Sequence, residues 1–569
     1  MSNEKKSPTP RTVALVAATV GLVYLLIGLG TASHYGITWD QSMQDWYLAE
    51  RNLRYLLSFD KQWLDFNHPV DLSMGSAHPD LNHVAVPWKT MHFGNLLSAA
   101  GCYIFFAKLG LFDSVTAHHA PNFLLMGVVL VLMFNLIKKH FGVAAALVCV
   151  FVIVFQPRFW AHGHFNTKDF PYACIMAFTM LAARNGLLKR EAVWIFIASI
   201  LLGLAGSTKP NAVLIPVILA IWYPLSRSGT AEPTDENRIS GGGKLFAVAL
   251  LLSPFIAAVT YIVSWPFLWF DPIGGLRLFL GHYLPWSVRG EGGNQLVTLA
   301  TFIIVQPPAV LLFGLAGSTM ALRGVIKNKK REIYSFLLLW LSLPVLRMLL
   351  PGTYNYDAVR HFIEYAVPLG GLTAVGAIDT VKWLARKFSE TPLPKRLPAH
   401  AMAGLIVAIP FVTWSIHMVK IHPHELVYFN FILGGPSGVE KLCGNCGMAT
   451  DYWGSSYRQG IDWLNENTEP ESIIVVPVAG HIVKSTRDLW MRPDLRLAVT
   501  RHKSDAVLES LLVKAKPAEV YVMYITRKSA YGELVRRVDE LNEPVYSIMV
   551  DGVPILKIVK LDGTAIWPR

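Results

Sequence analysis

Charged side chains that could perform acid–base or phosphate chemistry occur in four separated stretches of this sequence, each beside an apolar segment. They are Trp39, Asp40 and Asp45 in the first stretch, His162, His164, Lys168 and Asp169 in the second, Lys209 in the third, and Arg360, His361 and Glu364 in the fourth. A carboxylate can act as a general base, and Lys, Arg and His can hold an anionic phosphate. Because charges beside apolar segments need a partner or a task, the combination predicts a site that handles an anionic headgroup beside a general base.

The composition of the chain indicates an integral membrane protein. Of 569 residues, 53% are hydrophobic and 16% are charged, and the mean hydropathy is +0.39. About eleven apolar segments could cross a membrane core of roughly 30 Å. They lie near residues 13–32, 121–137, 143–156, 172–187, 192–207, 211–225, 245–265, 296–322, 333–350, 359–381 and 401–420. We therefore predict a polytopic α-helical protein.

The distribution of basic residues predicts the orientation of these segments. With the N-terminus in the cytoplasm, the basic clusters at 138–139, 184–190, 227–244, 323–331 and 382–396 all fall on the cytoplasmic side. The loops on the other side contain few Lys or Arg, as the positive-inside rule requires. The net charge of +12 is therefore explained by topology, and no nucleic-acid partner is expected.

The apolar segment 94–112 does not fit as a further span, because its insertion would move every later basic cluster to the outer side. We interpret it as a juxtamembrane or re-entrant helix within a long outer loop that runs from 33 to 120. Residues 1–420 then form a transmembrane domain that carries all four charged stretches on its outer side.

Residues 421–569 differ in composition and predict a small soluble α/β domain that faces outward. YRQGIDWLNEN, from residue 457, has helical spacing, whereas SIIVVPVAG, AEVYVMYI and PVYSIMV are typical of strands. Trp453, Tyr457 and Trp463 could stack on sugars or belong to the domain core. Cys443 and Cys446 form a single CxxC, for which a local disulfide, a free pair and a metal-bound pair are all open.

The acidic residues also have purely structural explanations. Asp40 could cap the helix that follows it. Asp45 and Glu50 could lie on the solvated face of that helix, because a spacing of five residues does not align Asp45 with Asp40 on an α-helix. Lys168 and Asp169 could form a simple salt bridge at a bend of the chain.

The remaining basic residues have similar alternatives. Lys209 could extend its amine toward the membrane interface, and Arg360 and His361 could be interfacial anchors. His162 and His164 could hold a metal ion, but two His one residue apart give weak support for a metal site. We therefore predict metal-independent chemistry without a cofactor.

Over nearly its whole length the chain resembles the integral-membrane glycosyltransferases of the GT-C fold, in the family 39 group that includes protein O-mannosyltransferases and the aminoarabinose transferase acting on lipid A. WDQSMQDWY at 39–47 is similar to the family's Asp-Glu motif, with Gln41 where Glu is usual. VPWKTMHFGNLLSAAGCYIFFAKLGLF followed by HHAPNFLL is similar to a proline-containing stretch of the family. NTKDFP is similar to the second acidic site, and RHFIEYAVPL to an Arg-led motif that enters a late span.

This resemblance implies an inverting transferase that moves a sugar from a polyprenyl phosphate of the undecaprenyl type to an acceptor hydroxyl on the outer face of the membrane. Asp40 is then the general base, and Asp169 orients the acceptor, the base or a cation. The residues expected to hold the donor phosphate are Lys168, Lys209, Arg360 and His361, and possible acceptor or sugar contacts are Trp39, Asp45, His162 and His164. Asp40→Asn should abolish transfer, whereas Asp45→Asn should retain most of it.

The resemblance leaves the sugar open, and the acceptor could be a protein, a lipid or a glycan. A bacterial inner membrane, with the C-terminal domain in the periplasm, is the expected location. A lipid-linked glycan ligase or polymerase and a polytopic transporter or flippase are the alternative functions. Transporters tend to place ionisable residues near the bilayer midplane and to contain internal repeats. The predicted spans are nearly free of carboxylates and show no repeat, which favours a transferase.

Overall fold

The computed structural model describes residues 10–65, 88, 92–227, 241–288, 295–350, 353, 357–390, 398–444, 447–499 and 519–561. Every predicted membrane segment is helical within these ranges. The helices are α1 (Pro10–Thr31), α4 (Ser114–Phe141), α5 (Val143–Phe155), α7 (Asp169–Lys189), α8 (Ala192–Thr208), α9 (Leu214–Arg227), α10 (Gly241–Val263), α12 (Gln295–Ile304), α13 (Pro308–Ile326), α14 (Arg331–Arg347), α15 (Ala366–Glu390) and α16 (Ala399–Ile421). The predicted polytopic helical fold is thus confirmed.

The segment 296–322 is two helices rather than the single one that we predicted. The break between α12 and α13 falls at residues 305–307, just before Pro308. Consecutive prolines at 307 and 308 cause it, because proline lacks the amide hydrogen that a helix needs and restricts the residue before it.

Six helices of the described ranges are individually long and apolar enough to cross a membrane. A seventh span results if α5 and α6 (Pro157–Phe165), which meet at an angle of 62°, are counted as one broken span. The other helices of the bundle are shorter or less apolar and pack beside these, as the tight pairing of α7 with α8 and of α8 with α10 illustrates. The chain is therefore an integral membrane protein, while the total of about eleven spans stays a prediction.

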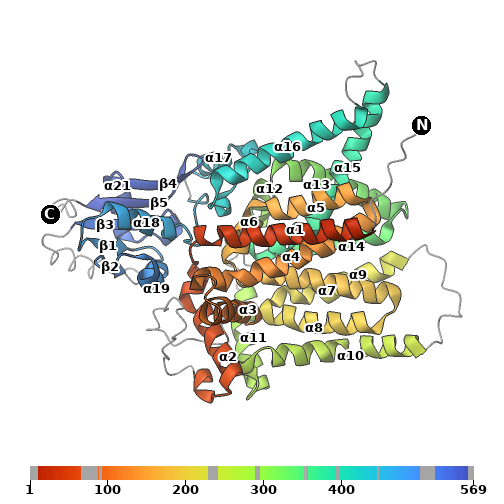
Figure 1. The fold of residues 1–569 in the computed structure, drawn as a ribbon, viewed down its shortest axis with the longest axis horizontal. Helices are drawn as coiled ribbons and strands as arrows, with labels where there is room; N and C mark the ends of the chain where they lie inside the picture. The colour runs from red at the N-terminus through yellow and green to blue at the C-terminus, as the bar shows by residue number, and fades with distance from the viewer. Residues whose placement is uncertain are drawn as a thin grey trace.

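The long helices run side by side, and a small sheet lies at one end of the bundle (Figure 1). At the opposite end, Arg184 of α7 pairs with Glu332 of α14 at 2.6 Å, and Lys330 donates a hydrogen bond to the carbonyl of His140. These contacts gather basic residues of three predicted cytoplasmic junctions at the end away from the sheet. Basic residues of these junctions therefore lie together, while the orientation of the bundle in a membrane stays a prediction.

Shorter helices lie across the sheet end of the bundle. They are α2 (Trp46–Ser58), α3 (Phe93–Gly101) with a π-helical continuation over Cys102–Lys108, and α11 (Pro272–Val288). Figure 1 shows α3 nearly end-on, whereas the bundle helices lie in the plane of the view. The segment 94–112 is therefore a helix that crosses the bundle direction, consistent with a juxtamembrane helix.

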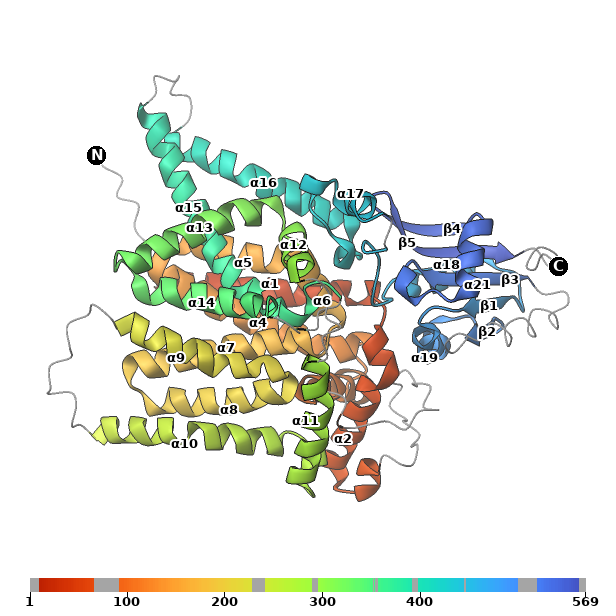
Figure 2. The ribbon, with the colours of Figure 1, turned by 180° about the vertical axis from the view of Figure 1, so that it is seen from behind.

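Within its described residues, the C-terminal region contains a mixed sheet of five strands in the order β2-β1-β3-β5-β4. Three strands were predicted, namely β1 (Ile473–Val476), β3 (Val520–Ile525) and β4 (Tyr546–Val550), whereas β2 (Arg496–Val499) and β5 (Val553–Leu561) were not. The sheet is parallel across β2, β1 and β3 and antiparallel across β3, β5 and β4. The accompanying helices are α17 (Gly435–Leu442), α18 (Tyr457–Asn467), α19 (Gly480–Trp490) and α21 (Glu533–Leu541), and Figure 2 shows this α/β unit from behind.

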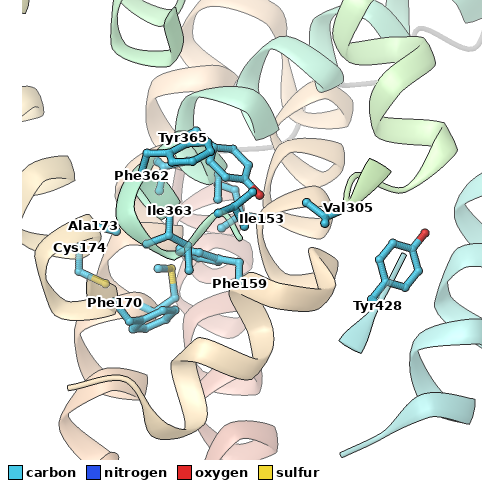
Figure 3. Packing of buried hydrophobic residues seen from close by; sticks show 14 of the residues in the cluster. Ile153, Phe159, Phe170, Ala173, Cys174, Val305, Phe362, Ile363, Tyr365 and Tyr428 are labelled. Atoms are coloured by element: carbon cyan, nitrogen blue, oxygen red, sulfur yellow. The ribbon is translucent and has the colours of Figure 1, made fainter. Parts of the chain in front are cut away.

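An apolar core underlies the sheet end of the bundle. Figure 3 shows Phe159, Phe170 and Ile363 packed together, and two of these buried residues adjoin carboxylates that the sequence singled out, since Phe170 follows Asp169 and Ile363 precedes Glu364. Because these apolar neighbours are buried, the backbone that carries the charged side chains has little freedom. The direction of the charged side chains is therefore fixed.

Candidate active site

Five predicted residues from all four charged stretches meet where the bundle faces the sheet. Lys168 Nζ lies 3.1 Å from Asp40 Oδ2, and Arg360 Nη1 lies 3.0 Å from the same oxygen. Lys209 Nζ lies 2.7 Å from Asp169 Oδ1, and Arg360 Nε lies 3.9 Å from Asp169 Oδ2. Arg360 therefore joins the two acid–base pairs into one charge network.

The two oxygens of Asp40 have different surroundings. Oδ2 takes both cations, whereas no hydrogen bond to Oδ1 exists among the residues that the structure describes. The Asp40 side chain is 28% exposed, in contrast to 5% for Arg360. One carboxylate oxygen is thus fixed by charge, and the other can receive a proton from a group that enters the site.

Each residue of the network sits where a helix begins or ends. Asp40 precedes a π-helical turn over Gln41–Asp45, and its side chain makes no capping hydrogen bond, so the capping interpretation is wrong. Lys209 has extended φ/ψ between α8 and Pro210, as a residue before proline prefers. Its amine is buried against Asp169 rather than extended toward the interface.

The start of α7 is organised by Asn166. Its side-chain oxygen accepts the backbone N–H groups of Lys168 and Asp169, and its amide donates to Asp169 Oδ2 at 2.9 Å. Asp169 thereby stands in the first turn of α7, where the helix dipole favours a negative charge. Because Lys168 and Asp169 have different ionic partners, the simple salt bridge between them is not formed.

Our placement of Asp45 and Glu50 on a solvated helix face is wrong. Asp45 is 2% exposed and lies 3.0 Å from Lys168, and Glu50 is 1% exposed and pairs with Arg54 at 2.8 Å. The π-helical turn explains Asp45, because i→i+5 bonding brings residues five apart onto one side of the helix. Asp40 and Asp45 therefore share one lysine.

The network sets the ionisation of Asp40. Burial alone would raise the pKa of Asp40, but the charges of Lys168 and Arg360 outweigh it and lower the pKa to about 2. Burial likewise would lower the pKa of Lys168, and the charges of Asp40 and Asp45 outweigh it and raise that pKa. Both groups are therefore charged in the absence of a bound molecule.

Three further residues complete the network, and two of them come from the C-terminal region. Asp357 lies 3.5 Å from Arg360 and 3.2 Å from Arg527. The guanidinium of Arg360 also lies over the ring of Trp453, at 4.5 Å from its centroid. Asp357 stands three residues before Arg360, so spacing could have suggested it, whereas no sequence signal points to Arg527.

The histidines and Trp39 have separate environments. His162 Nδ1 accepts a hydrogen bond from the Asn166 amide and its ring lies beside Trp453, whereas His164 stacks on Tyr35. The carbonyl oxygen of His361, rather than its ring, accepts the Lys209 amine at 3.0 Å. Trp39 lies under Arg527 at 5.2 Å and donates its backbone N–H to the Trp453 carbonyl.

A metal centre has no candidate cluster of three or more His, Cys, Asp or Glu side chains in the described ranges. Metal independence stays a prediction. Cys443 is disulfide-bonded, and its pairing with Cys446 stays a prediction because Cys446 lies outside the described residues. Tyr457 is buried and Trp463 is partly buried in the core that includes the sheet, which agrees with the core interpretation, whereas Trp453 is buried against Tyr35, Ala161 and Phe165 instead.

An open apolar pocket of about 360 Å³ lies between α8, α10 and the turn η6 (Pro210–Val213), which directly follows Lys209 of the network. Its wall is almost entirely apolar and includes Leu202, Val213, Tyr261 and Leu276. An acyl or prenyl chain is the kind of group that such a wall accepts.

Comparisons with known proteins agree with part of the resemblance. Residues 103–258 match the family model described as dolichyl-phosphate-mannose-protein mannosyltransferase. Two crystal structures of ArnT from Cupriavidus metallidurans, one bound to undecaprenyl phosphate and one in the apo state, each match with 12% sequence identity, 98% of this chain and 99% of that chain covered, and a TM-score of 0.49. Among curated proteins no match is found. The matched stretch contains Lys168, Asp169 and Lys209, and over this stretch the predicted resemblance to family 39 glycosyltransferases is confirmed.

Proposed function

We propose that this protein is an inverting glycosyltransferase that moves a sugar from a polyprenyl phosphate to an acceptor hydroxyl at the sheet end of the bundle. The observation that carries the proposal is the unequal pairing of the two oxygens of the Asp40 carboxylate. Its Oδ2 lies within 3.1 Å of two cations, and its Oδ1 has no hydrogen bond within the described part of the chain.

The two oxygens suit a single displacement. Oδ1 accepts the proton of the acceptor hydroxyl while that hydroxyl oxygen attacks the anomeric carbon of the donor. The bond from the anomeric carbon to the phosphate oxygen breaks, and its electron pair stays on the lipid phosphate. The phosphodiester with one negative charge becomes a monoester with two, while Asp40 becomes neutral.

Lys168 and Arg360 match this movement of charge. A carboxylate with a pKa of about 2 is a weak base as long as both cations stay on it. When a donor phosphate shares Lys168 and Arg360, Asp40 loses part of their stabilisation and its pKa rises toward a useful value. As Asp40 takes the proton, both cations can turn toward the leaving phosphate and stabilise its charge.

The neighbouring features supply the remaining parts. Lys209, held against Asp169, is followed directly by the turn η6, which lines the apolar pocket, and the pocket accepts part of the prenyl chain. Asp169 orients Lys209 and Arg360. The donor is of the undecaprenyl type and the acceptor is a protein, lipid or glycan hydroxyl in the periplasm of a bacterium, with the basic end of the bundle in the cytoplasm.

The test uses purified protein in lipid nanodiscs with a panel of polyprenyl-phosphate sugars. Wild type should be stabilised against heat by one donor and should release its sugar slowly to water. Asp40→Asn should bind that donor and lose release by 10²-fold or more, on the order of a general base contribution. Glu50→Gln, a buried carboxylate of the same segment that pairs with Arg54, is the matched control and should retain release.

Loss of release in Glu50→Gln equal to that in Asp40→Asn would contradict the assignment of the base. Failure of every donor, including the native one, to stabilise wild type would reject the transferase and favour transport.

A further inference from the structure

A loop of the C-terminal region forms one wall of the charge network. Asp451 caps this loop by accepting the backbone N–H groups of Trp453, Gly454 and Ser456. The loop meets the first charged stretch so closely that a Cβ on Gly36 would lie 2.5 Å from the Ser455 carbonyl oxygen. The fixed contact means that the sheet region is built into the site rather than loosely tethered to it.

Arg527, just after β3, spans this boundary with three contacts. Nη1 donates to the Tyr452 carbonyl at 2.6 Å, Nη2 lies 3.2 Å from Asp357 Oδ1, and the guanidinium lies over Trp39. Asp357 Oδ2 faces Arg360 at 3.5 Å. Asp357 is therefore shared between an arginine of the bundle and an arginine of the sheet region.

The sharing of Asp357 between the two arginines controls how strongly Arg360 can bind an incoming anion. Asp40, Asp169 and Asp357 all compete for Arg360, and a donor phosphate must join that competition. The side chain of Asp357 is 5% exposed. If Asp357 lost Arg527, it would pair more strongly with Arg360, because water cannot reach the carboxylate to replace the lost partner.

We propose that Arg527 is a positioning residue for donor binding: by holding one oxygen of Asp357, it keeps Arg360 open to the lipid phosphate. The inference rests on the proposed function, since it assigns the phosphate to Arg360. It gives the C-terminal region a direct part in donor affinity.

The experiment measures binding of undecaprenyl phosphate to the full-length protein in nanodiscs at pH 8, with undecaprenol as the uncharged control lipid. Arg527→Gln should weaken binding of undecaprenyl phosphate about tenfold, the effect of one partly buried charge interaction, and should leave undecaprenol binding unchanged. Arg527→Lys should recover part of the loss. Arg537→Gln, on an exposed helix of the same region, should bind like wild type.

The decisive variant is the double substitution Asp357→Asn with Arg527→Gln. If Arg527 acts by neutralising Asp357, removal of both charges restores binding to within about twofold of wild type, because the two effects are not additive. In transfer assays Arg527→Gln should raise KM for the donor while kcat changes little.

Two results would overturn the inference. Binding by the double variant as weak as that of Arg527→Gln, or a fall in kcat with unchanged KM, would mean that Arg527 only supports the fold. If wild type does not distinguish undecaprenyl phosphate from undecaprenol, the proposed function itself fails and this inference fails with it.

Discussion

Lys168→Gln tests the charge network most directly, because one amine holds two carboxylates. Lys168 Nζ lies 3.1 Å from Asp40 and 3.0 Å from Asp45. At an effective dielectric constant of about 20, one such charge pair is worth about 5 kcal/mol before desolvation. Asp40 keeps Arg360, whereas Asp45, whose side chain is 3% exposed, loses the charge of Lys168 at close range. We expect the free energy of unfolding to fall by about 3 kcal/mol, the lower end for a broken buried pair.

The deficit should depend on pH with a defined sign. The pKa of Asp40 is lowered from 3.8 to about 2, so its contribution to stability is complete above about pH 5 and is lost as the pH falls toward 2. In Lys168→Gln the pKa of Asp40 moves back toward its ordinary value. Asp40 then contributes less to stability at neutral pH, and less is lost when the pH falls. The difference between wild type and Lys168→Gln should therefore be full at pH 7 and should shrink below about pH 4.

Guanidinium chloride titration in detergent micelles at several pH values measures this difference. The matched control is Lys189→Gln, whose exposed amine lies 3.9 Å from Glu191 and should contribute nothing measurable. In the transfer assay Lys168→Gln should lower kcat by about 10²- to 10³-fold, as expected for loss of one group that stabilises developing charge. Equal stability of the two Lys→Gln variants at pH 7 would refute the reasoning.

Three further predictions use other parts of the site. Asp45→Asn should reduce transfer about tenfold, because it removes one of the two carboxylates that pair with Lys168. The sequence suggested only a mild effect, and full activity would show that Asp45 does not contribute to transfer. Gly36→Ala should lower thermal stability by about 1–3 kcal/mol through its clash with the Ser455 carbonyl, whereas Gly30→Ala, which meets nothing within 4 Å, should not; similar melting curves would contradict the close contact. A chelator such as EDTA should leave transfer unchanged because clustered cations already serve the phosphate, and loss of transfer restored by a divalent ion would reject this.

The helical membrane fold could be predicted because the spans are continuous apolar runs that must bury their own backbone hydrogen bonds. The strands β1, β3 and β4 were visible for a similar reason, since each is a short apolar stretch. β5 was missed although five of its nine residues are buried, because they do not alternate regularly with exposed ones, and β2 was missed because its side chains are at most partly buried. Prolines at 307 and 308 indicated a break that the length of the apolar run concealed.

The convergence of Asp40, Lys168, Asp169, Lys209 and Arg360 could be predicted in outline from their placement at span ends on one side of the membrane. Residue types alone thus determined that the chain is a membrane protein with cations and carboxylates gathered at one end. Tertiary structure decided the rest: a π-helical turn brought Asp45 to Lys168, and docking of the sheet region brought Arg527 to Asp357. Helical register and long-range docking depend on packing between segments far apart in the chain, and no local pattern of residues encodes the partner of a buried charge.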